Sequence, residues 1–365
     1  MPVNVFTSIT SNYIPKARVL AHSVKREFPS SRFTVVICDT VPTSFSLESE
    51  PFDAILRLED LAIPDLWQWV FQHSLVELCT AVKGFALVRL LAQEDCSAVL
   101  YFDPDIVVLA PLDGLVETLG SASILLTPHL AEPEVTMEGI LDNELSVLKH
   151  GIFNLGFIGV KRSPEGNRFA NWWRDRLTYF CHDDIPRGLF TDQRWIDLVP
   201  AYFDDIAILR DPVYNVCTWN LTHRRVAGSL GTTLTANGRK IVFYHFSGLD
   251  SGAQQIMLRK YGSEMPVLFE LREWYLAECE RMGQRTYGSI PWAFGTFDNA
   301  EPISYVHRKL YRERLDLRNA FPDPFSAGNV NRSYFHWFEA NHEDEAAGVK
   351  TSISWWQKVY ALFGT

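Results

Sequence analysis

The chain has 365 residues, enough for one large domain with an appendage or for two ordinary domains. Hydrophobic residues make up 47% of it and charged residues 21%, which is the balance of a folded globular protein and excludes a disordered or fibrous chain. The 34 basic and 44 acidic residues give a formal net charge of −10 without any block of like charges. This charge pattern disfavours general binding to nucleic acid.

The cysteines and the N-terminal residues indicate the cellular compartment of the protein. Six cysteines are far apart and include no C-x-x-C pair, so neither a zinc site nor a redox motif is indicated. The first ten residues, MPVNVFTSIT, lack the basic and apolar regions of a signal peptide, and no apolar run approaches the roughly 18 residues of a membrane span. We expect a cytoplasmic protein with reduced thiols.

The first 110 residues alternate short apolar runs with segments of helical periodicity, the pattern of a mainly parallel sheet with crossover helices. The expected strands are 3–9, 32–39, 54–60 and 98–103. The expected helices lie near 17–28, 65–78 and 80–94, the last with Thr80 as its N-cap. The fold class is therefore α/β.

The alternation continues to about residue 250 and then stops. Further strands are expected at 106–112, 123–129, 153–160 and 242–248, and helices at 141–150, 163–181 and 191–203. One long helix fits 263–282, and the remainder is loop and helix rich in proline and aromatic residues. We therefore expect an α/β domain over residues 1–250 and a helical C-terminal region over 251–365.

The stretch AVLYFDPDIVV is the most informative one for chemistry. Four apolar residues before Asp103 place this carboxylate and Asp105 at the end of a central strand, where open α/β sheets bind ligands. Pro104 favours an extended Asp103, and in an extended chain residues i and i+2 point the same way, so both carboxylates could reach one Mg²⁺ or Mn²⁺ ion. The alternative is a strand-ending turn without a metal, because Asp and Pro are common turn residues.

Several ordered blocks resemble the retaining nucleotide-sugar glycosyltransferases of the GT-A fold, of the glycosyltransferase family 8 type. VNVFTSITSNYIP is similar to the family's first strand and nucleotide loop, TAVKGFALVRLL to its helix with a basic residue, and YFDPD to its D-x-D motif. FNLGFIGV, FTDQRWIDLVP and YHFSG resemble its F-N-x-G, D-Q and H-x-x-G blocks. The resemblance covers about residues 3 to 250. It implies a Rossmann-like, mainly parallel sheet flanked by helices.

The resemblance also implies roles for the matching positions. The metal ligands would be Asp103, Asp105 and His245. The donor nucleotide and phosphates would be bound by Thr7, Ser8, Asn12, Tyr13, Lys83, Arg89, Asp103 and Gly248. The donor sugar at the reacting centre would be contacted by Asn154, Asp192 and Gln193, with the Gln193 amide against the anomeric face.

Three of these residues have a purely structural alternative. His245 lies among apolar neighbours and could be a buried strand-end histidine. Asp192 follows Thr191 near a predicted helix start, where an acidic residue is favoured in any protein. Asn154 on an apolar strand is costly to bury without partners, which favours a ligand, although it could equally bridge backbone groups.

The sequence departs from the family pattern at two places. Ser8 stands where the nucleotide loop usually carries an acidic residue. Leu249, Asp250 and Ser251 follow Gly248 where the family usually has a lysine that grips the diphosphate. The candidates to supply that cation are Arg187, Arg194 and Lys260.

These observations predict a metal-dependent hexosyltransferase that uses a nucleoside diphosphate sugar, UDP being the expected nucleotide, with retention of anomeric configuration and Mn²⁺ or Mg²⁺ as cofactor. The acceptor is expected to be a glycan or a lipid-linked saccharide, with Trp219 and Asn220 as an acceptor contact. Two alternatives stay open: a phosphoryl-transfer hydrolase that uses D-x-D, and a non-catalytic carbohydrate-binding protein. The chain lacks a P-loop or G-x-G-x-x-G, which weakens kinase and dehydrogenase interpretations.

The last fifteen residues carry an aromatic and aliphatic stripe at helical spacing, formed by Ile353, Trp356, Tyr360 and Phe363. Such a stripe suits a membrane interface, but the acidic run HEDEAA upstream opposes binding to anionic lipid. We therefore favour packing of this stripe on the protein, or against a second subunit, over peripheral membrane contact.

Overall fold

The computed structural model describes residues 2–330 and 332–341. Contacts between Cα atoms divide the chain into two compact units. The first comprises Met1–Ile63 and Leu75–Trp292, and the second Pro64–Ser74 with the residues from Ala293 onward. The first unit thus continues past residue 250, where the change of sequence pattern suggested a boundary.

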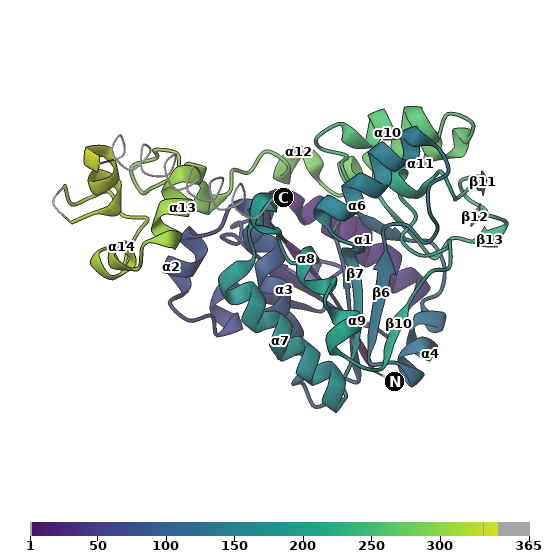
Figure 1. Ribbon diagram of the computed structural model, residues 1–365, viewed down its shortest axis with the longest axis horizontal. Coiled ribbons are helices and arrows are strands. Elements are labelled where there is room, and N and C mark those ends of the chain that lie inside the picture. The colour runs from purple at the N-terminus through teal and green to yellow at the C-terminus, as the bar shows by residue number, and fades with distance from the viewer. Residues whose placement is uncertain (1, 331, 342–365) are drawn as a thin grey trace, which may run out of the picture. The chain divides into compact units, whose positions relative to one another are not determined.

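A seven-stranded sheet forms the centre of the first unit (Figure 1). Its strands are β1 (Val3–Ile9), β2 (Arg32–Ile37), β3 (Ala54–Arg57), β4 (Ala98–Phe102), β6 (Ile124–Pro128), β7 (Phe153–Lys161) and β10 (Ile206–Ile208), in the order β10-β6-β7-β4-β1-β2-β3. All neighbouring pairs are parallel except those of β7, which runs antiparallel to β4 and β6. The mainly parallel α/β sheet predicted from the sequence is confirmed, and the short edge strand β10 had not been predicted.

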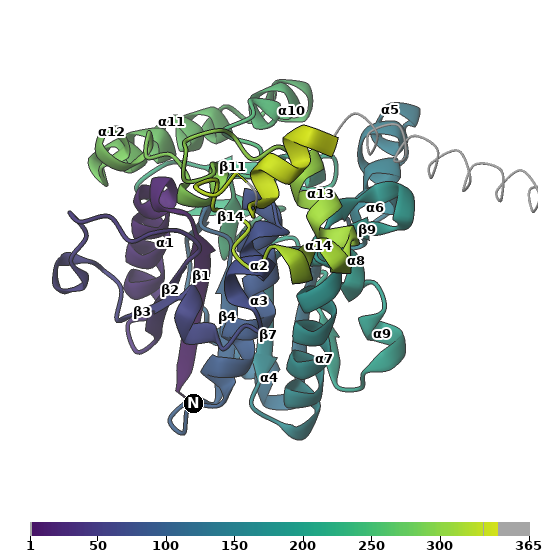
Figure 2. The ribbon, with the colours of Figure 1, turned by 90° about the vertical axis from the view of Figure 1, so that its left-hand side faces the viewer.

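Helices cover both faces of this sheet (Figures 1 and 2). Helices α1 (Ile14–Glu27) and α4 (Asp113–Ser121) share one apolar core with alternate residues of β1 and β4, such as Val5 and Leu100. Helices α3 (Leu75–Leu91) and α7 (Pro164–Phe180) pack together on the other face. They meet at Gly84, where a Cβ would lie 2.7 Å from the Cα of Arg174.

Helix α3 begins earlier than predicted. Thr80 is not its N-cap but lies inside it, where the hydroxyl donates to the carbonyl of Val76 at 2.8 Å. The helix predicted over 65–78 is divided into α2 (Leu66–Phe71) and the start of α3. The helix predicted over 191–203 is likewise two short ones, α8 (Gln193–Ile196) and α9 (Val199–Tyr202).

Two short strands carry the chain across the carboxyl end of the sheet. Strand β5 (Ile106–Val108) pairs antiparallel with β14 (Phe243–His245), and the register sets Ile106 opposite His245. Because Asp105 directly precedes Ile106, this pairing brings His245 beside the D-P-D turn. The ring of Phe246, the residue after His245, stacks on Tyr275 of helix α11 (Pro266–Arg281) at 3.9 Å between ring centroids.

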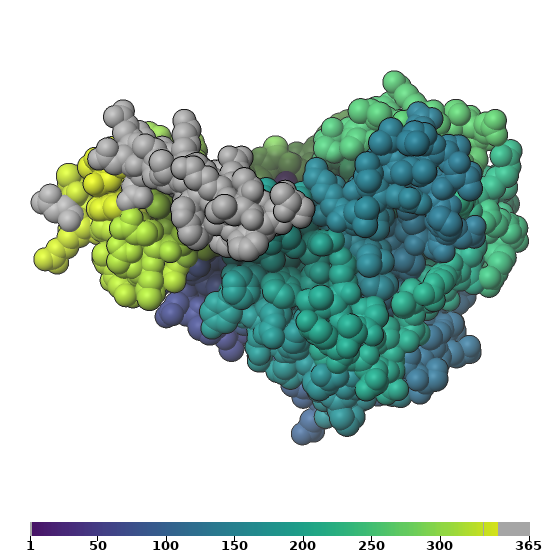
Figure 3. Space-filling model, viewed as in Figure 1, coloured from purple at the N-terminus to yellow at the C-terminus, as the bar shows by residue number. Residues whose placement is uncertain are grey.

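The remaining elements of the first unit surround this core. They are α5 (Met137–Gly139), a π-helical segment η4 (Ile140–Glu144), α6 (Leu145–His150), the hairpin β8 (Asp183–Asp184) and β9 (Leu189–Phe190), the small sheet β11 (Val226–Gly228), β12 (Leu234–Ala236) and β13 (Arg239–Lys240), and helices α10 (Ala253–Tyr261), α11 (Pro266–Arg281) and α12 (Gln284–Tyr287). Figure 3 shows the α5–α6 segment at the surface beside α10. Lys260 of α10 joins them through ion pairs with Glu138 at 2.7 Å and Asp142 at 2.5 Å.

The second unit contains α2, α13 (Tyr305–Glu313) and α14 (Leu315–Ala320) around an aromatic core that includes Phe71, Tyr311 and Tyr334. The buried Arg308 guanidinium donates to the carbonyl of Phe71 at 3.0 Å and of His73 at 2.8 Å. These bonds fasten the segment Pro64–Ser74 to the distant C-terminal helices. The predicted stripe of Ile353, Trp356, Tyr360 and Phe363 lies outside the described residues.

Within residues 2–330 and 332–341, none of the helices is long and apolar enough to cross a membrane. All six cysteines are free thiols.

Candidate functional site

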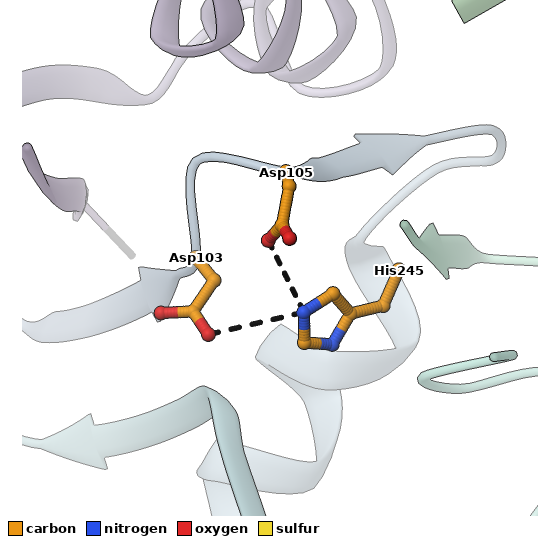
Figure 4. Close-up of side chains that lie close together, drawn as sticks. All are labelled: Asp103, Asp105 and His245. Atoms are coloured by element: carbon orange, nitrogen blue, oxygen red, sulfur yellow. Dashed lines mark ion pairs between the residues drawn. The ribbon is translucent and has the colours of Figure 1, made fainter. Parts of the chain in front are cut away.

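The D-P-D segment is a tight turn at the end of β4. The amide of Ile106 donates to the carbonyl of Asp103 at 3.1 Å, which closes a β-turn over Asp103, Pro104 and Asp105. The amide of Asp103 donates to the carbonyl of Gly156 on β7 at 2.8 Å. The extended conformation expected from Pro104 does not continue through Asp105, and the turn itself directs both carboxylates towards His245 (Figure 4).

These three residues form a compact group of oxygen and nitrogen ligands. The Nε2 atom of His245 lies 3.1 Å from Asp105 Oδ1 and 3.9 Å from Asp103 Oδ2, and the three ligand atoms lie within 4.8 Å of one another. The His245 side chain is 3% exposed, whereas those of Asp103 and Asp105 are 28% and 20% exposed. The group is therefore buried on the His245 side and open to solvent on the side of the two carboxylates.

Burial and charge oppose each other in this group. Burial lowers the pKa of His245, but the Asp105 carboxylate beside it outweighs burial and raises that pKa above its usual value. Burial raises the pKa of Asp105, and the His245 imidazole outweighs burial in turn and lowers it. The pair thus favours charge separation when nothing else binds the two carboxylates.

Lys83 of α3 is buried beneath the same turn. Its ammonium lies 3.0 Å from Asp192 Oδ2 and 3.3 Å from Asp103 Oδ1, and it donates to the carbonyl of Leu155 at 3.1 Å. Burial lowers the pKa of Lys83, but the carboxylates of Asp103 and Asp192 raise it overall, so the lysine stays charged. The Tyr101 hydroxyl donates to Asp103 Oδ1 at 2.5 Å.

The residues in contact here carry an excess of negative charge. Asp103, Asp105 and Asp192 contribute three negative charges and Lys83 one positive charge, which leaves −2 when His245 is neutral. Two partly open carboxylates and one imidazole are a donor set that Mn²⁺ and Mg²⁺ accept. The residues present therefore fit one divalent cation at Asp103, Asp105 and His245, both by ligand type and by charge.

Asp192 and Gln193 lie at the start of α8. Asp192 is the residue before the helix, and its side chain makes no capping bond, so the capping alternative does not account for it. Its pKa is raised, because burial outweighs the Lys83 ammonium. Thr191 before it has φ of 45°, a strained conformation for a β-branched residue that is found at functional sites.

The Gln193 amide is held at both ends by backbone groups. Its Oε1 accepts from the amide of Leu155 at 3.1 Å, and its Nε2 donates to the carbonyl of His150 at 3.0 Å. Gln193 is 7% exposed. This residue thus fixes the end of α6 against β7, beside Asp192 and Lys83.

Asn154 belongs to a buried network of amides that extends to His245. Its Oδ1 accepts from the amide of Gly156 at 3.1 Å and from Asn215 Nδ2 at 2.9 Å, and its Nδ2 contacts His129 Nε2 at 3.2 Å. The other end of Asn215, Oδ1, lies 3.2 Å from His245 Nδ1. Sequence reasoning missed Asn215, and the only signal was a polar residue in the apolar stretch VYNVC.

The predicted nucleotide loop lies at the end of β1. Thr7 is fully buried and its hydroxyl has no hydrogen-bond partner among the residues that the structure describes, while the Ser8 hydroxyl donates to the carbonyl of Cys79 at 2.7 Å. Asn12 Oδ1 accepts from the Thr10 hydroxyl at 2.6 Å. The Tyr13 hydroxyl donates to Asp250, and burial followed by this carboxylate raises the pKa of Tyr13.

Asp250 lies two residues after Gly248, which has φ of 77°. Its carboxylate connects the segment after β14 to Tyr13 of the nucleotide loop and to Lys16 of α1. The Lys16 ammonium lies 2.5 Å from Asp250 Oδ2 and 4.1 Å from the centre of the Tyr13 ring. Lys16 is buried and was not among the predicted cations. The family's usual lysine after Gly248 is absent from this sequence, and Lys16 of α1 supplies a cation near Gly248 instead.

The cations proposed from the sequence are engaged elsewhere. Arg194 lies 3.0 Å from Asp197, Arg187 lies 3.4 Å from Asp184, and Lys260 pairs with Glu138 and Asp142. Arg89 is exposed and lies six residues beyond Lys83 on α3, about 240° around the helix. None of the contacts described for residues 2–330 and 332–341 brings these four to the Asp103 group.

The predicted acceptor residues separate into two kinds. The Trp219 ring packs edge-on against His245 at 5.5 Å and against His129 at 5.4 Å, so it covers the histidine of the ligand group. Asn220 is buried and bonds to the amide of Cys217 at 3.0 Å and the carbonyl of Asn215 at 3.0 Å. Asn220 thus stabilises the loop rather than facing solvent.

Comparison with known proteins gives distant relatives. No family model matches the chain. It is 25% identical over 175 residues to the uncharacterized protein YfnF of Bacillus subtilis (strain 168), a match over 47% of this chain and 56% of that protein. It is 23% identical over 247 residues to the uncharacterized protein YfnD of the same organism, over 66% of this chain and 76% of that protein. The chain thus spans little more than half the length of YfnF.

Among solved structures, the chain is similar to the galactosyltransferase LgtC in complex with donor and acceptor sugar analogs. That likeness has 16% identity and a TM-score of 0.42, and it covers 79% of this chain and 97% of LgtC. In the present chain, the mainly parallel sheet lies between two helical layers, and the acidic pair ends its central strand β4. Asp103, Asp105, Lys83, Asp192 and His245 meet at the carboxyl end of this sheet.

Proposed function

We propose that this protein has the GT-A fold and is a glycosyltransferase that moves a hexose from a nucleoside diphosphate sugar, with UDP as the nucleotide, to a glycan or lipid-linked acceptor with retention of anomeric configuration. The observation that carries the proposal is the group of Asp103, Asp105 and His245, which has the ligand types and the uncompensated charge for one divalent cation. Retention, the nucleotide and the family 8 type follow from the sequence resemblance.

The leaving group defines what the site must do. Breaking the bond between the anomeric carbon and the diphosphate leaves a nucleoside diphosphate anion. A divalent cation held by Asp103, Asp105 and His245 would stabilise that developing charge as a Lewis acid. Lys83 holds Asp103 and Asp192 in place, because its ammonium lies between their carboxylates.

The donor is proposed to bind across the carboxyl edge of the sheet. Thr7, Ser8, Asn12 and Tyr13 at the end of β1 would receive the nucleotide, and Gly248 would lie along the diphosphate. Asp192, Gln193 and Asn154 are proposed to face the donor sugar. For Gln193 and Asn154 this role requires the bound sugar to compete with backbone and amide partners that both residues already have.

A lipid-linked acceptor draws support from the surface beside the reacting centre. Four large apolar side chains on α5–α6 recur at spacings of four, four and three residues and are exposed: Met137, Leu141, Leu145 and Leu148. This segment ends at His150, whose carbonyl accepts from Gln193. An apolar surface next to the donor sugar suits an acceptor with an apolar anchor.

The test is a thermal-shift panel of nucleotides and nucleotide sugars with and without Mn²⁺, followed by turnover with the donor that binds. A ligand of the native state raises the melting temperature by mass action. We expect donor binding and turnover to require Mn²⁺ or Mg²⁺ and to vanish in excess chelator. Asp105→Ala should abolish Mn²⁺ binding and turnover while the metal-free protein stays folded, because the carboxylate lies at a partly exposed turn.

Three outcomes would contradict the proposal in different ways. Full turnover in excess chelator would exclude the metal site. Release of phosphate from a phosphate ester through Asp103 would favour the phosphoryl-transfer alternative. Donor binding without transfer to any acceptor or to water would favour the carbohydrate-binding alternative.

A further inference from the structure

The amide network behind His245 fixes where its protons lie, starting from one backbone group. The amide of Gly156 can only donate, and it faces Asn154 Oδ1 at 3.1 Å. The reverse orientation of the Asn154 side chain would set two donors against each other. The carbonyl oxygen of Asn154 is therefore assigned by the backbone and not by choice.

The same reasoning passes along the network to His245. Since Asn154 Oδ1 is an acceptor, its second neighbour at 2.9 Å must be the amide nitrogen of Asn215. Asn215 then presents its own Oδ1 to His245 Nδ1 at 3.2 Å. An amide oxygen can only accept, so Nδ1 of His245 carries a proton and Nε2 is the nitrogen left to face Asp103 and Asp105.

The network ends at a second histidine in the opposite direction. Asn154 Nδ2 can only donate, so His129 Nε2 at 3.2 Å accepts and the His129 proton is on Nδ1. Burial lowers the pKa of His129 to about 4, in agreement with a neutral ring. From His245 Nδ1 through the two asparagines to His129 Nε2, each donor and acceptor is thus assigned by its neighbour.

Two backbone features make this line of hydrogen bonds possible. Asn215 has φ of 52°, a left-handed conformation that asparagine tolerates better than most residues. At Gly156 a Cβ would lie 2.5 Å from Cε1 of His245 and 2.8 Å from Asn154 Oδ1. Only glycine at position 156 leaves room for the imidazole and the Asn154 amide together.

We propose that Asn215 and Asn154 are positioning residues, which hold His245 with Nδ1 protonated and its Nε2 lone pair directed to the cation shared with Asp103 and Asp105. Neither asparagine contacts the cation. This inference rests on the metal site of the proposed function, and it gives Asn154 a role in addition to the proposed contact with the donor sugar. Partners that orient a ligating histidine in this way affect metal affinity about 10- to 100-fold.

The first test titrates the protein with Mn²⁺ alone, without donor. Asn215→Gly removes the amide while keeping a residue that accepts the positive φ. The matched control is Asn237→Gly, because Asn237 has the same φ of 52° in an exposed turn between β12 and β13. We expect Asn215→Gly to weaken Mn²⁺ binding about 10- to 100-fold. Equal affinity in Asn215→Gly and the wild type would overturn the proposal.

The second test observes the protons directly in the protein loaded with Mg²⁺, which is diamagnetic. In ¹⁵N-histidine-labelled wild type saturated with Mg²⁺, we expect the His245 proton on Nδ1 and Nε2 unprotonated. At the same Mg²⁺ concentration, Asn215→Gly should show a mixture of protonation forms. A wild-type His245 with its proton on Nε2 would overturn the proposal, and a wild type that binds no Mn²⁺ would instead overturn the metal site of the proposed function.

Discussion

Two buried polar networks meet at the D-P-D turn, and they stabilise the site by different means. On the side of α3, Lys83 pairs with Asp103 and Asp192 through charge. On the side of β14, the neutral amide of Asn215 contacts His245, and the amide of Asn154 contacts Asn215. The ionic network sets which groups are charged, because removing any one charge leaves another unbalanced. The amide network sets direction, because each amide can be satisfied in only one orientation.

Breaking the ionic network should have the largest effect. Lys83→Met leaves the buried Asp192 carboxylate without its cation, so we expect the free energy of unfolding in urea to fall by about 3–5 kcal/mol. Asp192→Asn on the same background should restore most of that loss. The control is Arg89→Met on the exposed face of α3, which should change the free energy of unfolding by no more than about 0.5 kcal/mol. A Lys83→Met protein as stable as that control would show that the network is not ionic.

Lowering the pH should break the amide network from its His129 end. The pKa of His129 is about 4 in the folded protein and near 6.5 unfolded, so between these values the unfolded chain binds the extra proton. Stability from this group is therefore complete above pH 6.5 and lost as the pH falls towards 4. Between pH 7 and pH 5 we expect the wild type to lose about 2 kcal/mol that His129→Gln keeps. Parallel pH profiles for the two proteins would contradict a neutral His129.

The ion pair between Lys16 and Asp250 sharpens the comparison, because it has the same chemistry in a more exposed place. The Asp250 side chain is 57% exposed, against 3% for Asp192. Screening by water should leave Asp250→Asn within about 1 kcal/mol of the wild type in urea unfolding. A loss as large as that of Lys83→Met would mean that burial is not what separates the two pairs.

The sequence predicted the strands of the sheet closely. The expected first strand, 3–9, coincides with β1, and 153–160 nearly coincides with β7. Continuous apolar runs report burial on both faces, which is a local property of the chain. The start of α3 was missed because threonine is a common N-cap residue, which suggested that the helix begins at Thr80. Packing on the sheet instead extends the helix back to Leu75.

The sequence predicted which residues form the ligand group, but it did not predict the backbone geometry that brings them together. Asp103, Asp105 and His245 were singled out by motif, and the structure brings them together. The backbone conformation differs from the predicted one. A β-turn, closed by the hydrogen bond from the Ile106 amide to the Asp103 carbonyl, directs the carboxylates, and the chain is not extended there. Whether Asp192, Gln193 and the nucleotide loop serve the donor stays a prediction.

The buried strands, and the acidic and histidine residues that end them, could be identified from the sequence alone. Apolar runs and the polar residues at their ends are local features that depend only on neighbours in the chain. Only the tertiary structure decided the partners of those residues. Asn215 lies 61 residues from Asn154 and 30 from His245, and Lys83 lies 109 residues from Asp192. Such pairs depend on how β7, β14 and α3 meet at one edge of the sheet. A hydrogen bond or an ion pair is decided by distances of about 3 Å, which no local pattern encodes.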